Sequence, residues 1–205
     1  MSLGALILVV SLAQVPAGGW TAAGTTRDVT LEFRDDPQRD VREVRATTEL
    51  PFAAAGIFGL VCDFTHYGSL VSGVQETKMV SGTAPSDYEI YMRYAPRFVV
   101  VSARDVVVRV QGRSMPNGSS GCHWMDLKDR EPERKGVVRM PLLRGSWTIE
   151  PLDATRSRIV YQVAVDPGGR LPGWLVRRGA VSTLPDVIEQ VRRRLERESH
   201  PLRVQ

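Results

Sequence analysis

The end of the chain carries a strongly amphipathic helix pattern, and this feature constrains the fold more than any other. Apolar residues recur there at alternating steps of three and four, and most positions between them are polar or charged. The apolar residues are Val181, Leu184, Ile188, Val191 and Leu195. Such spacing predicts a helix with one apolar face and one face in water. Pro172, upstream of the run, suits a first helical turn, where its missing N–H would have no partner. The segments before this helix must therefore supply an apolar surface for it to cover.

Most of those earlier segments show the alternation of half-buried strands. The clearest is 88–94, where four large apolar residues alternate with Glu89, Tyr91 and Arg93. Further strands are predicted at 29–34, 41–50, 74–80, 98–110, 122–127, 137–140, 145–150 and 158–165. The segment 98–110 is either one strand or two strands joined by a bulge. A shorter helix is predicted after Pro51. This order predicts an α+β domain with one curved antiparallel sheet and segregated helices.

Size and charge exclude several classes of function. The chain has 205 residues, enough for one domain with a cavity inside its core. Its net charge is +4, but no basic stripe is interleaved with aromatic residues, so a nucleic-acid partner is not expected. The cluster Arg192-Arg193-Arg194 has two interpretations, a solvated helix face or a weak attraction to anionic lipid headgroups.

The N-terminal segment resembles a targeting signal. Residues 1–26 contain no charged side chain, and 3–12 are almost continuously apolar. Ala13-Gln-Val-Pro-Ala17 then offers a cleavage site, although a basic stretch before the apolar core is missing. The apolar run is short for a membrane span. We therefore expect a signal peptide or apolar segment at 1–19, a single domain at 20–199 and a tail at 200–205. The expected location is periplasmic or secreted, or membrane-tethered if the signal is not cleaved.

The cysteines and histidines give little indication of a catalytic or metal-binding site. Cys62 falls in an apolar helix pattern, which favours free buried thiols for Cys62 and Cys122, with a disulfide as the alternative in an exported protein. His66, His123 and His200 are far apart and have no metal-ligand spacing. No metal and no cofactor are expected.

Several motifs, taken in order along the chain, carry a family resemblance. They are Arg42-Glu-Val-Arg-Ala, Ser102-Ala-Arg-Asp-Val-Val-Val-Arg, Gly136-Val-Val-Arg, Gly145-Ser-Trp-Thr-Ile-Glu-Pro-Leu and Asp166-Pro-Gly-Gly-Arg-Leu-Pro-Gly-Trp-Leu-Val. With these motifs the chain resembles the START (steroidogenic acute regulatory protein-related lipid-transfer) domains, in particular exported bacterial ones, within the wider Bet v 1-like superfamily. The resemblance implies a helix-grip fold, in which a curved sheet wraps the C-terminal helix around an apolar tunnel. It also implies a non-catalytic protein that binds a lipid, a sterol-like molecule or a fatty acyl group.

The inward faces of the strands and of the final helix are the expected ligand-binding surface. The tunnel-lining candidates are Ile90, Met92, Tyr94, Arg93, Val108, Val110, Trp147, Ile149, Tyr161, Val163, Leu184 and Ile188. A solid core would show the same alternation, so that interpretation stays open. The final helix is expected to gate the tunnel, and a membrane surface, contacted transiently, is a further candidate partner.

One departure from the family pattern bears on the ligand. The resemblance implies that sterol-transporting members place a second arginine six residues after the arginine of the Arg-Asp pair, facing a glutamate on the preceding strand. Here that position is Val110, and Arg109 falls on the opposite face of the strand. The glutamate's position is Tyr91. These residues predict either a drier cavity or polar groups placed elsewhere, with Arg93 as the candidate, and a bulge that returns Arg109 to the tunnel is the alternative. Arg104 and Asp105 are expected to have structural roles.

Two other functions remain open alternatives. The stretch Asp63-Phe-Thr-His-Tyr-Gly also resembles the helix–strand junction of polyketide-cyclase-like relatives, which implies an enzyme on the same fold. Such chemistry would need a titratable pair aimed into the tunnel, and His123 with Asp126 or Arg93 is the pair that the sequence offers. A lipid-sensing module that binds a partner protein is the third hypothesis.

Overall fold

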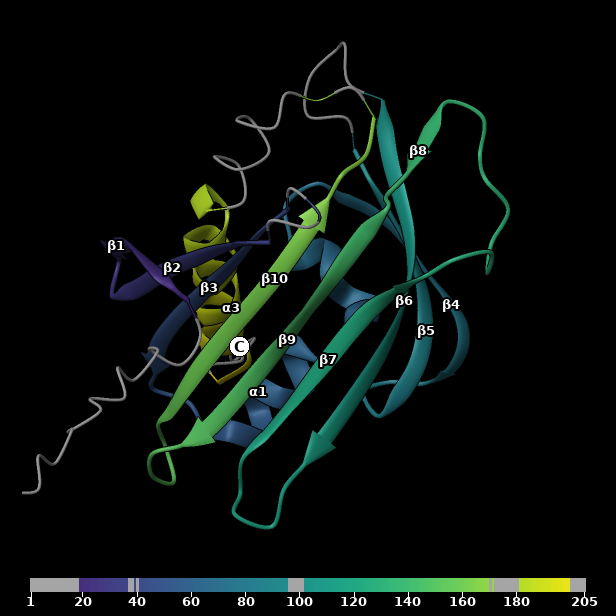
Figure 1. Ribbon diagram of the computed structural model, residues 1–205. Helices are drawn as coiled ribbons and strands as arrows, with labels where there is room; N and C mark the ends of the chain where they lie inside the picture. The colour runs from purple at the N-terminus through teal and green to yellow at the C-terminus, as the bar shows by residue number, and fades with distance from the viewer. Residues whose placement is uncertain are drawn as a thin grey trace, which may run out of the picture.

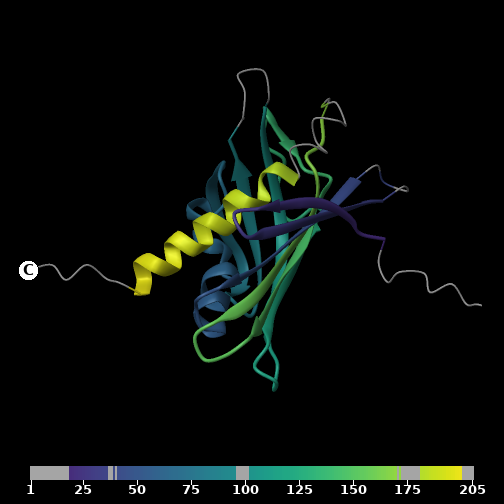
Figure 2. The ribbon, with the colours of Figure 1, turned by 90° about the vertical axis from the view of Figure 1, so that its left-hand side faces the viewer.

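The structure is a computed structural model, and it describes residues 19–36, 39, 41–95, 102–169, 171 and 181–199. The described residues form a curved sheet of ten strands, with the helices on one side of it (Figure 1). Figure 2, turned by 90°, shows α1 and α3 on the concave side of that sheet. The predicted α+β helix-grip architecture is confirmed.

The element bounds follow the chain in order. The strands are β1 (Thr21–Thr26), β2 (Val29–Asp36), β3 (Val41–Leu50), β4 (Val74–Thr83), β5 (Asp87–Tyr94), β6 (Ala103–Ser114), β7 (Ser120–Leu127), β8 (Val137–Arg139), β9 (Leu142–Pro151) and β10 (Ser157–Asp166). The helices are α1 (Ala54–Val61), the 3-10 helix η1 (Phe64–Ser69) and α3 (Leu184–Ser199).

The strand order in space is β1-β2-β3-β10-β9-β7-β6-β5-β4, and every neighbouring pair in this series is antiparallel. The short strand β8 departs from it and pairs in parallel with β6. The last strand, β10, lies between β3 and β9, so it joins the N-terminal hairpin to the rest of the sheet. Strands β1 and β4 are the two edges, and the sheet remains open.

The core lies between the concave face of the sheet and the helices. Alternate residues of each strand point into it because successive side chains of a strand point to opposite faces. On β10, for example, Ile159 is fully buried while its neighbour Arg158 is exposed and pairs with Glu49. Helix α3 adds its apolar stripe to the same core through Leu184, Ile188 and other residues.

Strand β1 is one of the elements that the sequence pattern does not predict. All six of its residues are exposed, so it has no alternation of polar and apolar side chains. It is held by backbone pairing to β2, which a single-sequence pattern cannot detect. The proposed signal segment before residue 19, the bulge near Ser102 and the helix start at Pro172 lie wholly or partly outside the described residues.

The preferred prediction for the cysteines was wrong, because Cys62 and Cys122 form a disulfide with their Cα atoms 5.8 Å apart. Cys62 follows the last residue of α1, and Cys122 lies on β7. Helix α1 packs against β7 and β9, and this tertiary contact brings two thiols together across a sequence separation of 60 residues.

Within the described ranges, no helix has both the length and the apolar character needed to cross a membrane. The same ranges contain no group of three or more His, Cys, Asp or Glu side chains that could hold a metal ion.

Candidate ligand-binding site

Strand register places the large apolar residues of the inner face side by side. Between β9 and β10, Trp147 lies opposite Tyr161 and Ile149 lies opposite Ile159. Between β5 and β6, Ile90 lies opposite Val108 in the same way. The concave side of the sheet is therefore a continuous apolar surface.

The structure brings eleven of the twelve candidate residues into one apolar cluster. Buried within it are Ile90, Met92, Val108, Val110, Trp147, Ile149, Tyr161, Val163, Leu184 and Ile188, and half-buried Tyr94 packs against them. The cluster includes residues from β5, β6, β9 and β10 on one side and from α3 on the other. These eleven residues remain the proposed lining of the ligand site.

Arg93 does not belong to this surface, and its prediction as a tunnel residue was wrong. Its Nε donates to Oε2 of Glu76 at 3.0 Å, and Arg134 binds the same carboxylate. Because Met92 and Tyr94 point inward, the residue between them must point to the outer face of the sheet. The pattern of the strand itself gives the correct orientation.

Arg109 also lies on the outer face, where it forms a 2.7 Å ion pair with Asp87. Val110 occupies the inner position beside it and is fully buried. Tyr91, at the position of the glutamate in sterol-transporting relatives, points outward and donates to Asp105 Oδ2 at 3.1 Å. The arginine–glutamate arrangement that the resemblance associates with sterol transport is thus absent from the described inner face.

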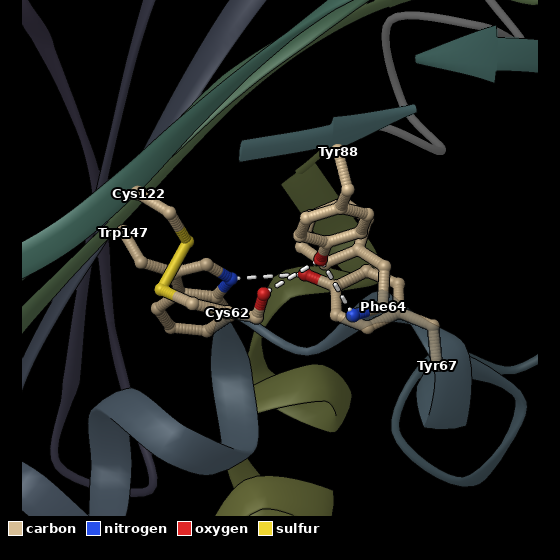
Figure 3. Close-up of a disulfide and its surroundings, with 6 residues drawn as sticks. All are labelled: Cys62, Phe64, Tyr67, Tyr88, Cys122 and Trp147. Carbon is tan, nitrogen blue, oxygen red and sulfur yellow. Dashed lines mark hydrogen bonds between the residues drawn. A yellow bond between two sulfur atoms is a disulfide. The ribbon is translucent and has the colours of Figure 1, made fainter. Parts of the chain in front are cut away.

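Aromatic residues of the inner face form a connected group that includes Trp147, Tyr161, Tyr67 and Phe64. The ring of Trp147 stacks on Tyr161 with centroids 4.1 Å apart, and its Nε1 donates to the Tyr67 hydroxyl at 2.9 Å. Tyr67 in turn stacks on Phe64 at 3.8 Å. Both residues come from η1, so this 3-10 helix contributes to the site (Figure 3). Sequence reasoning missed them because an irregular turn has no periodic pattern.

Tyr88 fixes the junction of α1 and η1 against the sheet. Its hydroxyl donates to the Cys62 carbonyl oxygen at 2.6 Å and accepts from the Phe64 N–H at 2.9 Å (Figure 3). The Cys62–Cys122 disulfide lies beside these bonds and ties the same junction to β7. Covalent and polar contacts thus hold η1 and its aromatic residues in place.

Burial changes the acid–base behaviour of these phenols. Desolvation raises the pKa of Tyr67, Tyr88, Tyr94 and Tyr161 well above the usual range, because the charged form loses its water. All four are therefore neutral at physiological pH, and each can donate a hydrogen bond.

Arg104 and Asp105 have structural partners. Asp105 is almost fully buried, and its Oδ1 accepts a hydrogen bond from Arg139 Nε at 2.7 Å. This ion pair neutralises the charge of Asp105 and fixes β8 on β6. The Arg104 guanidinium donates to the backbone carbonyls of Ser102, Pro167 and Gly168. It therefore connects the start of β6 to the segment that follows β10.

The structure does not assemble the catalytic pair considered above. His123 is exposed, and its Nε2 lies 3.0 Å from Oε1 of Gln111. Asp126 is engaged elsewhere, since it accepts from the Leu143 N–H at 3.1 Å and pairs with Lys128.

A separate pocket opens at the surface between η1, β4 and α3. Its volume is about 310 Å³, and mostly polar residues line it, including His66, Glu76 and Arg194. This pocket is distinct from the apolar inner face, and neither the sequence pattern nor the resemblance predicts it.

Comparison with known proteins decides the family. The protein-family model for the START domain matches residues 72–200 of this chain. The chain belongs to the START domain family. Over 97 residues it is 31% identical to an uncharacterized protein of Pseudomonas aeruginosa, a match covering 47% of this chain and about half (48%) of that protein.

Solved structures agree with the START assignment. A STAR-related lipid transfer protein from Xanthomonas axonopodis is 26% identical, with a TM-score of 0.78 over 87% of this chain and 99% of that chain. Human STARD10 is 18% identical, with a TM-score of 0.79 over 89% of this chain and 75% of that chain, and shows the shared fold.

Proposed function

We propose that this START domain binds a lipid or another hydrophobic small molecule between the inner face of its sheet and α3, and that it carries or senses that molecule. The observation that carries the proposal is the continuous apolar inner face, covered by an amphipathic helix. An apolar concave surface with few polar groups is typical of a hydrophobic ligand site. Family membership and the similarity to a bacterial lipid transfer protein support it.

Release of such a ligand requires the cover to move, and we propose α3 as the gate. The described part of α3 is attached to the sheet side mainly by its apolar stripe and by an ion pair between Asp186 and Arg27 at 2.9 Å. Apolar contact is non-directional, so a helix held this way can slide or lift without breaking a polar network.

Export and transient membrane contact complete the proposal. A disulfide persists in oxidising compartments such as the periplasm, which supports export. Each of Arg192, Arg193 and Arg194 is already paired with Glu189 or Glu198 on α3. We therefore propose a brief contact with the headgroups rather than stable attachment.

The first test is organic extraction and mass spectrometry of the protein purified from its own host. One lipid-like species at one molecule per chain is the expected result. A second sample should carry Val163→Trp, which places a large ring on the inner face, where Val163 is 7% exposed. Val160→Trp makes the same change on the opposite face of the same strand and serves as the matched control.

The two variants separate the outcomes. We expect Val163→Trp to lose the bound species and Val160→Trp to keep it, with both variants folded by circular dichroism. An empty wild-type protein that also takes up no added lipid would contradict the proposed function. Retention of the lipid by Val163→Trp would place the ligand outside the inner face.

A further inference from the structure

The hydroxyl groups of the tyrosines differ in how many hydrogen bonds they form. Tyr88 both donates and accepts, and Tyr91 donates to Asp105. Tyr67 accepts from Trp147 but has no acceptor for its own O–H among the described residues. Tyr94 and Tyr161 have no hydrogen-bond partner at all within that part of the chain. Three hydroxyl groups on the inner side therefore have no acceptor for their O–H among the described residues.

The hydroxyls of Tyr94 and Tyr161 are not sealed into the packing. In the described part of the chain, Ser120 Oγ is the one side-chain polar atom that is both enclosed and without a partner. The two unpartnered phenol oxygens therefore retain accessible surface. Both side chains nevertheless point toward the core, because Tyr161 is only 6% exposed and stacks on Trp147, and because Tyr94 lies two residues after buried Met92 and packs against the same cluster.

The three groups also lie near one another. Trp147 contacts two of them, because its Nε1 donates to the Tyr67 hydroxyl at 2.9 Å and its ring stacks on Tyr161 at 4.1 Å, and Tyr94 packs against the same apolar cluster. Buried polar groups in folded proteins are nearly always hydrogen-bonded. Three donors without acceptors among the described residues are thus a site for an acceptor that comes from outside the chain.

We propose that Tyr67, Tyr94 and Tyr161 form a subsite that hydrogen-bonds an uncharged oxygen of the bound lipid, in an ester, ketone or alcohol. This inference rests on the proposed function and specifies its ligand class. It sets aside ligands whose buried end is a carboxylate or phosphate, since a charge is expensive to bury without a partner.

The charged side chains near this face are already engaged. Arg104 lies opposite Tyr94 in the register of β5 and β6, and its guanidinium is bonded to three backbone carbonyls. Asp126 is bonded to the Leu143 N–H and to Lys128. Arg104 is therefore not a free cation for an anionic headgroup, and the carboxylate of Asp126 would repel one.

The test compares four ligands with the same twelve-carbon chain: methyl laurate, dodecan-1-ol, dodecane and laurate. Each is delivered from cyclodextrin to the full chain, and binding is followed by tryptophan fluorescence, since Trp147 stacks on Tyr161. We expect the ester and the alcohol to bind about tenfold more tightly than dodecane, and laurate to gain no comparable advantage. The double variant Tyr94→Phe/Tyr161→Phe should lose this advantage without weakening dodecane binding.

Tyr91→Phe is the matched control, because it removes a hydroxyl from the outer face of the same strand as Tyr94 and should leave the preference intact. Equal binding of ester, alcohol and alkane would overturn the subsite and leave lipid binding standing. Preference for laurate over the ester would also overturn it. Failure of all four ligands to bind would count against both the subsite and the proposed function.

Discussion

At the scale of single residues, the tyrosines are the most informative group. Burial raises the pKa of Tyr67, Tyr88, Tyr94 and Tyr161, and burial together with the charge of Asp105 raises that of Tyr91 to about 12. These are all five tyrosines of the chain. The folded protein therefore keeps its phenols protonated at a pH where free tyrosine ionises.

This leads to a prediction for alkaline titration. We expect no phenolate absorbance at 295 nm from the folded protein between about pH 9.5 and 11, whereas the urea-unfolded chain should titrate near pH 10. Above pH 10 the unfolded state loses protons that the native state retains. The free energy of unfolding should therefore fall as pH rises, by up to about 1.4 kcal/mol per pH unit for each tyrosine, and should be unaffected by these groups below pH 9.

Tyr91→Phe provides the check on this titration, since Tyr91 has the smallest rise in pKa for which a value can be stated. The variant should delay the first ionisation of the folded protein to a still higher pH. A phenol of the folded wild-type protein that titrates at about pH 10 would show that its ring is exposed to water.

Residue-level prediction from the sequence succeeded where alternation alone was used. It placed Ile90, Met92 and Tyr94 on one face, and the same rule places Arg93 on the other. Arg93 entered the predicted site as a polar group placed elsewhere, because the second arginine and the glutamate of the sterol-transporting pattern are replaced by Val110 and Tyr91. In our proposal tyrosine hydroxyls take this role, one of them from η1, whose irregular backbone has no periodic pattern in the sequence.

At the scale of elements, the α1–η1 junction depends on contacts that no local pattern reveals. The alternating strands and the amphipathic stripe of α3 are visible in the sequence because each reflects burial of one face. The approach of α1 to β7 is a tertiary contact, and so the pairing of Cys62 with Cys122 could not be read from the spacing. Edge strand β1 is hidden for the opposite reason, since it buries no side chain.

The disulfide should make a large contribution to stability. Closing a loop of 60 residues in the unfolded chain corresponds to about 4 kcal/mol in the chain-entropy model. We expect Cys62→Ala/Cys122→Ala to lower the free energy of unfolding by about this amount, measured by urea denaturation. Reduced wild-type protein should match the variant, because both lack the cross-link. A loss below about 1 kcal/mol would show that Tyr88 and the apolar contacts hold the junction without it.

At the scale of the whole molecule, the N-terminal hairpin and the C-terminal helix contact each other. The turn between β1 and β2 reaches α3, where Arg27 pairs with Asp186 (Figure 2). The proposed ligand lies beneath the helix that this contact restrains. The chain thus uses the turn after β1, a strand that buries no side chain, to restrain its last element.

A charge reversal tests whether this restraint limits exchange. The pair is exposed on both sides, so it contributes less than about 1 kcal/mol. If opening of α3 is rate-limiting, Arg27→Glu should speed release of a bound fluorescent lipid to acceptor vesicles by up to about fivefold, because it places two negative charges together. Asp186→Arg should do the same, and the double variant should return to the wild-type rate. The differences should shrink in 0.5 M salt, which screens exposed charges. Equal release rates in all four proteins would show that the ligand leaves by a route that does not require the start of α3 to lift from the hairpin.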